Sequence, residues 1–501
     1  MYDPKILRLT IKIRSVSVSV CLCLIVTCLR NESAAPQASP ASGPFPPAVT
    51  TAAKNVYPLK IPANGRYLVD RENKPFRIQG DSAQSLIVNL TYAEAEVYFS
   101  NRHAKGFNSV NINLIEHKFG VKAPANRNGD APFTRPGDFS TPNEAYFAFA
   151  DSIIDLAASK GMLVSLAVMY LGANGGDEGW WSVLSNKTNS QAVCYRFGQY
   201  VGNRYKNRAN ILWVIGGDFA PPAGSEGETR LHKFMDGVKA AGATQLWAGD
   251  WKAPCMSTDV RAFASAMDVN AVYTYGSPEN DGLTYVEAAM AYQYSPAHPA
   301  YLKETGYEEE SWLPGDRTSV RKYEYWAVLG GTTAGAFFGH RDIWEFATAE
   351  WSSGFLPQHG PWQKALNSAG TLDMMRMGLL LDALPWYDLV PSGLAGMKSL
   401  VASGGGTFGK QDYVAAAADR LGTTLVAYMP PAATSAKITI NMTALRGPAH
   451  GRWFDPTSGE YANVPREPIP NRGTASFAIP SANSGGARDW VLVLRTIPKA
   501  K

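Results

Sequence analysis

The sequence has few of the residues from which metal and redox centres are built. Only five cysteines and seven histidines occur in 501 residues, and Cys21, Cys23 and Cys28 fall in the N-terminal segment. Neither His-Glu-x-x-His nor a His-x-His on the first expected strand is present. A zinc protease or a metal-dependent hydrolase barrel would lack its ligands, so we expect no metal and no cofactor. Cys194 and Cys255 remain for the mature chain, and their separation in sequence leaves open whether they pair.

The chain also carries little excess of positive over negative charge. The formal net charge is +4 and no block is dense in lysine or arginine, so we expect no nucleic-acid partner. No Gly-x-Gly-x-x-Gly follows the first expected strand, which disfavours a doubly wound dinucleotide-binding sheet. Aromatic residues, in contrast, are plentiful, with 13 Trp and 23 Tyr. Aromatic faces with polar edges suit sugars, although most aromatic side chains in any protein pack in the core.

The N-terminal segment resembles an export signal. Four basic residues precede a short apolar run, Ser15 to Leu29, which is too short to favour a transmembrane helix. We expect residues 1–29 to be a signal peptide or lipoprotein signal, and the Ala-, Pro- and Ser-rich residues 30–54 to be a disordered linker. Cys28 ends a sequence similar to a bacterial lipoprotein box, with Thr27 an imperfect match, which predicts a lipid anchor. The expected location is periplasmic, extracellular or lipid-anchored at the bacterial cell surface.

From residue 55 to residue 389 the pattern alternates between strands and helices. Capping motifs and apolar periodicity predict helices at 91–105, 141–160, 191–205, 228–241, 319–329 and 362–384. The strand candidates are 75–82, 107–115, 162–170, 210–218, 244–249, 268–275, 300–304 and 334–339. This number of strand and helix pairs predicts an α/β fold of the (β/α)₈ TIM-barrel type.

After about Pro391 the composition changes. Short apolar runs are separated by clusters of Gly, Pro, Asn and Asp, which is typical of a β-sandwich. We therefore expect residues 390–501 to form a small C-terminal accessory β-sandwich. No internal repeat is evident, and the oligomeric state is left open.

The stretch Asn210 to Asp218 carries the clearest chemical signal. Five apolar residues, Ile211 to Ile215, read as a strand buried on both faces, and two glycines then precede a carboxylate. Gly216 and Gly217 suggest a backbone that approaches a ligand closely. Asp218 would stand at the carboxyl end of the strand, where barrels keep their active sites. The alternative, which the segment alone does not exclude, is that Asp218 caps the next helix.

A second carboxylate, Glu304, ends the seventh expected strand. Strands four and seven lie across the ring from each other, so Asp218 and Glu304 form a candidate catalytic pair for cleavage of a glycosidic bond. Glu304 could instead form a surface ion pair with Lys303 or Arg321. Glu308, Glu309 and Glu310, one helical turn later, are rival carboxylates. Other polar or aromatic residues at strand ends are substrate-binding candidates: Asp81, Asn111, Asn113, Tyr170, Asp250, Tyr273, Tyr275, Tyr307, His340 and Trp344.

Several of these candidates have structural alternatives. Asp81 could orient a substrate hydroxyl or cap a turn. A lone histidine such as His340 is more often a hydrogen-bonded structural residue, so we expect at most a supporting role. Tyr307, Trp344 and the pair Trp180–Trp181 could be sugar platforms or core residues.

Several motifs together resemble those of the apiosidase-like glycoside hydrolases. They are Gly80-Asp-Ser82, Ala104-Lys-Gly-Phe-Asn108, the strand ending at Asp218, Glu304-Thr-Gly-Tyr-Glu308 and Ile343-Trp344. Trp453-Phe-Asp-Pro-Thr-Ser-Gly459 is similar to the β module named "putative collagen-binding domain of a collagenase". The resemblance implies a secreted bacterial hydrolase of plant cell-wall glycan, with Asp218 and Glu304 matching the family's catalytic carboxylates. Gln84 stands where the family commonly has an aromatic residue, so the resemblance does not fix apiose as the sugar.

Two hypotheses follow. The first is a glycosidase, with retention expected, in which Asp218 is the general acid/base, Glu304 is the nucleophile and an oligo- or polysaccharide of pectic type is the substrate. The second is a non-catalytic glycan-binding barrel. The distance between the two carboxylates separates them, because a separation beyond about 10 Å fits neither geometry of two-carboxylate hydrolysis.

Overall fold

The computed structural model describes residues 56–275, 283–310, 317–348, 351–353, 360–465 and 468–496. The expected signal segment, the linker and Cys28 lie outside the described residues. Within the described part of the chain, no helix combines the length and the apolarity needed to cross a membrane.

The first domain is a (β/α)₈ barrel, as the sequence predicts. Its parallel strands follow one another in chain order around a nearly closed sheet, and a short antiparallel strand, β8 (Cys255–Met256), is added next to β9. The barrel strands are β3 (Ile78–Ser82), β4 (Ser109–Ile115), β5 (Leu163–Met169), β6 (Ile211–Gly216), β7 (Trp247–Asp250), β9 (Asn270–Tyr273), β10 (Ala300–Glu304) and β11 (Gly335–Phe338). They are buried almost throughout, as expected for strands with helices outside and side chains inside.

The ring closes between β7 and β9 through a side chain. Ser257 Oγ donates to the carbonyl of Gly249 at 2.8 Å and accepts from the backbone N–H groups of Gly249 and Ala271 at 3.0 and 2.8 Å. This hydroxyl bridges the two strands, and the Trp247 carbonyl of β7 also accepts from the backbone N–H groups of Asp268 and Val269, directly before β9.

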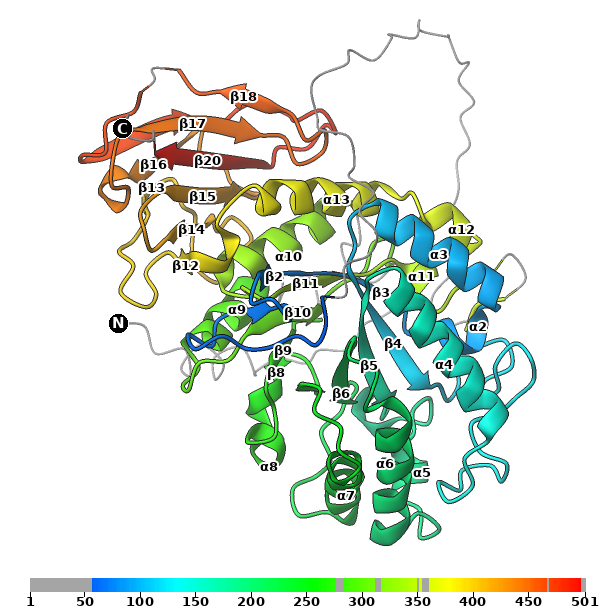
Figure 1. Ribbon diagram of the computed structural model, residues 1–501. Coiled ribbons are helices and arrows are strands. Elements are labelled where there is room, and N and C mark those ends of the chain that lie inside the picture. Colours follow the sequence, from blue (N-terminus) through cyan, green and yellow to red (C-terminus); the bar gives the residue numbers. More distant parts are fainter. Residues whose placement is uncertain are drawn as a thin grey trace, which may run out of the picture. The chain divides into compact units, whose positions relative to one another are not determined.

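Helices surround the strands (Figure 1). They are α2 (Leu86–Asn89), α3 (Tyr92–Ala104), α4 (Glu144–Ser159), α5 (Trp181–Leu184), α6 (Gln191–Tyr205), α7 (Glu226–Ala240), α8 (Arg261–Ala264), α9 (Leu283–Gln293), α10 (Arg317–Gly330), α11 (Arg341–Trp344), α12 (Trp362–Ala365) and α13 (Ala369–Asp382). The capping motif that predicts a helix from residue 91 is confirmed, because Thr91 and Glu94 form a capping box. The motif that predicts a helix from residue 141 is wrong, because α4 is capped by the side chain of Asn143. The long helix expected at 362–384 is divided into α12 and α13.

The N-terminal end of the barrel is covered by a hairpin. The strand expected at 75–82 is divided into β2 (Pro75–Phe76), which pairs with β1 (Leu68–Val69), and β3. Leu68 and Phe76 belong to the same apolar cluster as Tyr301 and Phe337 of the barrel strands. The hairpin does not cover the opposite end of the barrel, at the carboxyl ends of the strands, where an active site is expected.

The C-terminal module consists of two antiparallel sheets, consistent with the expected β-sandwich. The larger sheet has the order β12 (Leu389–Pro391), β14 (Ala415–Asp419), β15 (Thr424–Met429), β20 (Trp490–Thr496), β17 (Ala449–Phe454) and β18 (Tyr461–Asn463). The smaller has β13 (Val401–Ser403), β16 (Lys437–Asn441) and β19 (Thr474–Ala478). Leu425, Ile438 and Leu492 share one buried cluster that joins the sheets.

A buried ion network links α10 to the C-terminal module. Arg321 donates to Asp489 through Nε and Nη2, both at 2.7 Å, and to Asp373 of α13 through Nη1 at 2.6 Å. Tyr428 of β15 also donates to Asp489, at 3.0 Å. Cys194 and Cys255, whose pairing the sequence left open, are both buried and free.

Candidate functional site

The strand β6 ends in three residues with left-handed backbone. Gly216, Gly217 and Asp218 have φ values of 97°, 91° and 55°. A Cβ at Gly216 would lie 2.1 Å from the carbonyl oxygen of Asp250, and one at Gly217 would lie 2.6 Å from Cδ2 of Tyr170. Both positions therefore require glycine. The close neighbours are parts of this protein, whereas Gly217 also lines the cavity, so the expected approach of a ligand to this backbone stays a prediction.

This bend turns Asp218 into the mouth of the barrel. Tyr170 donates through its hydroxyl to Asp218 Oδ2 at 3.0 Å, and Tyr273 also hydrogen-bonds the carboxyl group. The alternative role as a helix cap is excluded, because α7 starts at Glu226 and is capped by Ser225. A non-glycine residue with positive φ is a strained feature that commonly marks a functional site.

Glu304 reaches the same mouth through an irregular strand end. The pairing of β10 with β9 shifts register between Leu302 and Glu304. Such a bulge re-aims the residues that follow it. Lys303 and Glu304, which are consecutive in the chain, consequently both line the same cavity.

Hydrogen-bond donors surround the Glu304 carboxylate. Tyr307 donates through its hydroxyl to Oε1 at 2.9 Å, and Gln84 donates through Nε2 to Oε2 at 3.4 Å. The Lys303 ammonium lies 3.5 Å from Oε2 and 3.1 Å from Oδ2 of Asp250. These contacts favour the ionised form of Glu304.

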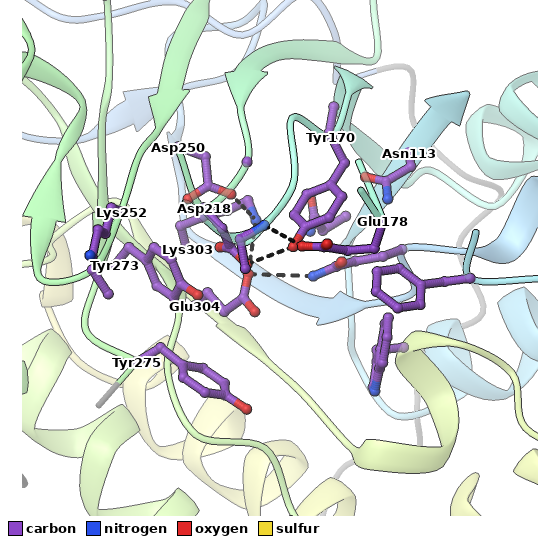
Figure 2. A pocket seen from close by; sticks show the side chains of 18 of the residues that line it. Asn113, Tyr170, Glu178, Asp218, Asp250, Lys252, Tyr273, Tyr275, Lys303 and Glu304 are labelled. Atoms are coloured by element: carbon purple, nitrogen blue, oxygen red, sulfur yellow. Dashed lines mark hydrogen bonds and ion pairs between the residues drawn. The ribbon is translucent and has the colours of Figure 1, made fainter. Parts of the chain in front are cut away.

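Three carboxylates converge at this point (Figure 2). One oxygen each of Asp218, Asp250 and Glu304 lies within 4.8 Å of the other two. Ligand atoms so spaced could hold a metal ion, but Lys303 already places a positive charge beside two of the carboxylates. The pair Asp218–Glu304 is thus well inside the roughly 10 Å limit set for two-carboxylate hydrolysis.

Burial and mutual repulsion raise the pKa values of Asp218 and Glu304. Burial, followed by the charge of Asp250, raises the pKa of Asp218 above its ordinary value. Burial also raises the pKa of Glu304, an effect that Lys303 opposes and that Asp218 and Asp250 reinforce. Both carboxyl groups therefore keep a proton to higher pH than isolated groups would, which allows one neutral acid beside one carboxylate.

The cavity has a volume of about 380 Å³, and one wall is aromatic. Phe119, Tyr307 and Trp344 form a buried cluster with Tyr170 packed against it. Glu178 and Lys252 also line the cavity. An aromatic wall opposite a polar floor is suited to a ligand with an apolar face and many hydroxyl groups.

Most of the residues expected to bind substrate do lie around this cavity. They are Asn111, Asn113, Tyr170, Asp250, Tyr273, Tyr275, Tyr307 and Trp344. Their roles remain predictions. Trp180 and Trp181 are not among the lining residues; Trp180 packs against Phe133 instead.

Two expected residues lie outside the cavity. Asp81 is fully buried and accepts hydrogen bonds from Tyr98 at 2.6 Å and Arg102 at 2.5 Å, both on α3. It therefore faces the helix layer, because alternate residues of a strand point to opposite sides. His340 caps α11 by accepting from the backbone N–H of Asp342. Both side chains serve structural contacts.

Sequence reasoning underestimated Lys303, which it considered only as a surface partner of Glu304. Two consecutive charged residues at the end of an apolar strand were the available signal, and the bulge that directs both inward leaves no sequence pattern. The sequence pattern also gives no signal for Glu178, Phe119 and Lys252, which lie in loops. Of the rival carboxylates, Glu308 accepts from Ser368 Oγ at 2.5 Å and from the backbone N–H of Gly370 at 2.7 Å, and so anchors the start of α13. Glu309 is exposed, whereas Glu310 lines the cavity and accepts from the backbone N–H of Tyr307 at 2.8 Å.

Comparison with known proteins agrees with this geometry. Residues 62–388 match the family described as "Apiosidase-like, catalytic domain", and residues 398–495 match the "Putative collagen-binding domain of a collagenase". Comparison with curated proteins gives no match.

Solved structures share the fold of the chain. One named "Glycoside hydrolase" has a TM-score of 0.75 at 21% identity, covering 90% of this chain and 99% of its own. A glycoside hydrolase family 5 structure from Bacteroides vulgatus has a TM-score of 0.74 at 19% identity, covering 89% and 98%.

Proposed function

The chain belongs to the apiosidase-like catalytic domain family and is an O-glycosyl hydrolase, and from this premise we propose that it cleaves a pectic-type plant cell-wall glycan with retention of configuration. The observation that carries the mechanism is the convergence of Asp218 and Glu304, with carboxylate oxygens within 4.8 Å. Carboxyl groups roughly 5 to 5.5 Å apart are typical of retaining enzymes, whereas inverting enzymes need roughly 6.5 to 9.5 Å. The 4.8 Å limit applies to the nearest oxygens of the two groups, and so close an approach fits the retaining range better than the inverting one, which supports retention.

In the first step, Glu304 attacks the anomeric carbon of the bound sugar. The bond between that carbon and the leaving oxygen breaks, Asp218 gives its proton to that oxygen, and a glycosyl ester forms on Glu304. The raised pKa values of Asp218 and Glu304 allow the pair to hold one proton. The assignment of that proton to Asp218 rests on the donors Tyr307, Gln84 and Lys303, which favour Glu304 as the anion.

In the second step, Asp218 acts as the base. It takes a proton from a water molecule, whose oxygen attacks the anomeric carbon and releases Glu304 as a carboxylate. Two inversions at the same carbon give a product with the starting configuration.

The test is a screen of the wild-type protein against pectic and hemicellulosic oligosaccharides. For any substrate found, proton NMR of the first-formed reducing sugar gives the anomeric outcome. We expect release of a sugar with retained configuration. An inverted first product would rule out the covalent mechanism, and a complete lack of cleavage across both classes would rule out the proposed substrate class.

We also propose that the protein is exported and carries a lipid on Cys28. The basic residues and the apolar run before Cys28 support this proposal. Mass spectrometry of the mature N-terminus should find a lipid-modified Cys28 in the membrane fraction. A Cys28→Ser variant should be released from that fraction, and equal membrane retention of both proteins would contradict the proposal.

A further inference from the structure

Asp250 lies beside the catalytic pair but has no part in the two steps described above. It ends β7, next to β6 in the barrel, and its backbone carbonyl accepts from the N–H of Gly217 at 2.5 Å. Its side chain lines the cavity and is 7% exposed, close to the 9% of Glu304. A role for the side chain must therefore be sought in the cavity.

The Asp250 carboxylate is only half satisfied. Oδ2 pairs with Lys303 Nζ at 3.1 Å, whereas Oδ1 is buried and has no hydrogen-bond partner among the described residues. A buried acceptor without a donor is costly, and native proteins rarely keep one without a reason.

Lys303 cannot supply the missing donor. Its ammonium already faces Asp250 Oδ2 and Glu304 Oε2. The amide orientation of Asn111 that satisfies its neighbours adds Oδ1 of Asn111 at 3.0 Å from Nζ. An ammonium has three hydrogens, and three acceptors surround this one.

A second unsatisfied atom lies on the aromatic wall. The indole Nε1 of Trp344 is a buried donor without a partner in the described part of the chain. Among the described residues that line the cavity, the fully buried side-chain atoms without a partner are thus an acceptor on Asp250 and a donor on Trp344. A ligand bearing several hydroxyl groups can satisfy both, because a hydroxyl both donates and accepts.

We propose that Asp250 is the specificity-determining acceptor for one hydroxyl group of the reacting sugar, with Lys303 and Asn111 as its positioning residues. The proximity of Asp250 to Asp218 and Glu304, within 4.8 Å between their oxygens, places that hydroxyl on the same ring as the anomeric carbon. The proposal rests on the proposed function, because it takes the reacting sugar as the occupant of the cavity. A site that bonds a substrate hydroxyl discriminates against the analogue that lacks it.

The test measures binding of free monosaccharides to the full-length protein by isothermal titration calorimetry. The probes are aldopentoses and aldohexoses, and for the sugar that binds most tightly, each of its monodeoxy analogues. We expect one analogue to bind the wild type about 10- to 100-fold more weakly than its parent, as for a hydrogen bond to a charged group. In Asp250→Ala this penalty should disappear, while Glu178→Gln, which alters another carboxylate of the cavity, should keep it.

Asp250→Ala removes the nearer of the two carboxylates that pair with the buried Lys303 ammonium, which endangers folding. The double variant Asp250→Ala with Lys303→Met removes both charges and should show the same loss of discrimination. An unchanged penalty in both variants, or no binding of any sugar in the panel, would overturn the proposal. Hydrolysis without discrimination through Asp250 would defeat this inference alone, whereas discrimination without hydrolysis would defeat the proposed function and make Asp250 the acceptor for a hydroxyl of a bound, non-reacting sugar.

Discussion

Two buried ionic clusters in this molecule differ in how completely their charges are satisfied. At the junction with the C-terminal module, Arg321 is held by two carboxylates, and every side-chain polar atom of Arg321, Asp373 and Asp489 has a partner. At the barrel mouth, three carboxylates converge, the Lys303 ammonium pairs with two of them, and an oxygen of Asp250 is left without a donor among the described residues.

The two clusters also differ in the regularity of their backbone and in whether they border a cavity. The junction cluster is built on a regular helix, α10, and is packed closed. The mouth cluster stands on a left-handed bend and a strand bulge, and it borders a cavity. A buried ion network that is fully paired supports structure, whereas one with surplus charge, strained backbone and open space is set up for chemistry.

The largest effect expected is on turnover. Glu304→Gln and Asp218→Asn should each lower kcat by about 10⁴-fold or more while leaving circular dichroism spectra unchanged. Asn is chosen at position 218 because it tolerates the left-handed backbone there. On an aryl glycoside with a good leaving group, Asp218→Asn should recover part of the rate of the first step, because such a leaving group departs with less help from protonation.

A control for these variants is Asp236→Asn, on the exposed face of α7, which should retain wild-type turnover. A wild-type rate in either active-site variant would refute the role given to that residue.

Disruption of the junction cluster should lower the stability of the protein. Arg321→Met removes one partner from a buried network and should lower the free energy of unfolding by about 3 to 5 kcal/mol. Urea unfolding monitored by tryptophan fluorescence measures the loss. At temperatures well below unfolding, turnover per folded molecule should match the wild type. A stability change under about 1 kcal/mol would show that the network does not hold the modules together.

A side chain added to the crowded backbone at the barrel mouth should have a smaller effect on stability. Gly217→Ala should cost roughly 1 to 3 kcal/mol of stability and should displace Tyr170, whose ring lies 2.6 Å from the added Cβ. Gly224→Ala is the matched control, because it also has positive φ, 73°, but nothing within 4 Å of its Cβ. The difference between the two variants in thermal unfolding isolates the crowding. Equal losses would mean that the glycine serves only the backbone angle.

Surplus charge at the mouth should appear in the pH–rate profile. After the larger effect of burial, Asp250 raises the pKa of both Asp218 and Glu304, so Asp250→Asn should move both limbs of kcat/KM to lower pH. Lys303 lowers the pKa of both groups, so Lys303→Met should move both limbs to higher pH. The two variants should therefore shift the profile in opposite directions. Identical limbs in all three proteins would show that these charges do not govern the pair.

The smallest effect is on the pH dependence of stability. Because the folded-state pKa of Glu304 is raised, the stabilisation from its protonated form is complete below the ordinary value of 4.5 and is lost as pH rises through the raised value. Glu304→Gln cannot lose that proton. Its unfolding free energy relative to the wild type should therefore increase from pH 5 to pH 9. A constant difference would mean that Glu304 has a normal pKa in the folded protein.

Much of the barrel could be predicted because its strands are buried apolar runs bounded by turn residues. Asp218 and Glu304 were found because each follows such a run directly. Side-chain direction is what the sequence does not reveal. Asp81 was misplaced because it points to the helix layer, and Lys303 was undervalued because a bulge turns it inward beside Glu304. In a strand, one residue of register reverses the face on which a side chain lies.

The central claim is that Glu304 forms a bond to the sugar while Asp218 handles the proton. Incubation with an activated 2-deoxy-2-fluoro glycoside of the cleaved sugar, followed by peptide mass spectrometry, tests it most directly, because the fluorine slows release of the glycosyl ester. We predict one label per molecule, on the peptide that contains Glu304, and none in Glu304→Gln. A label on Asp218, or turnover of the glycoside with no labelled peptide at all, would contradict it.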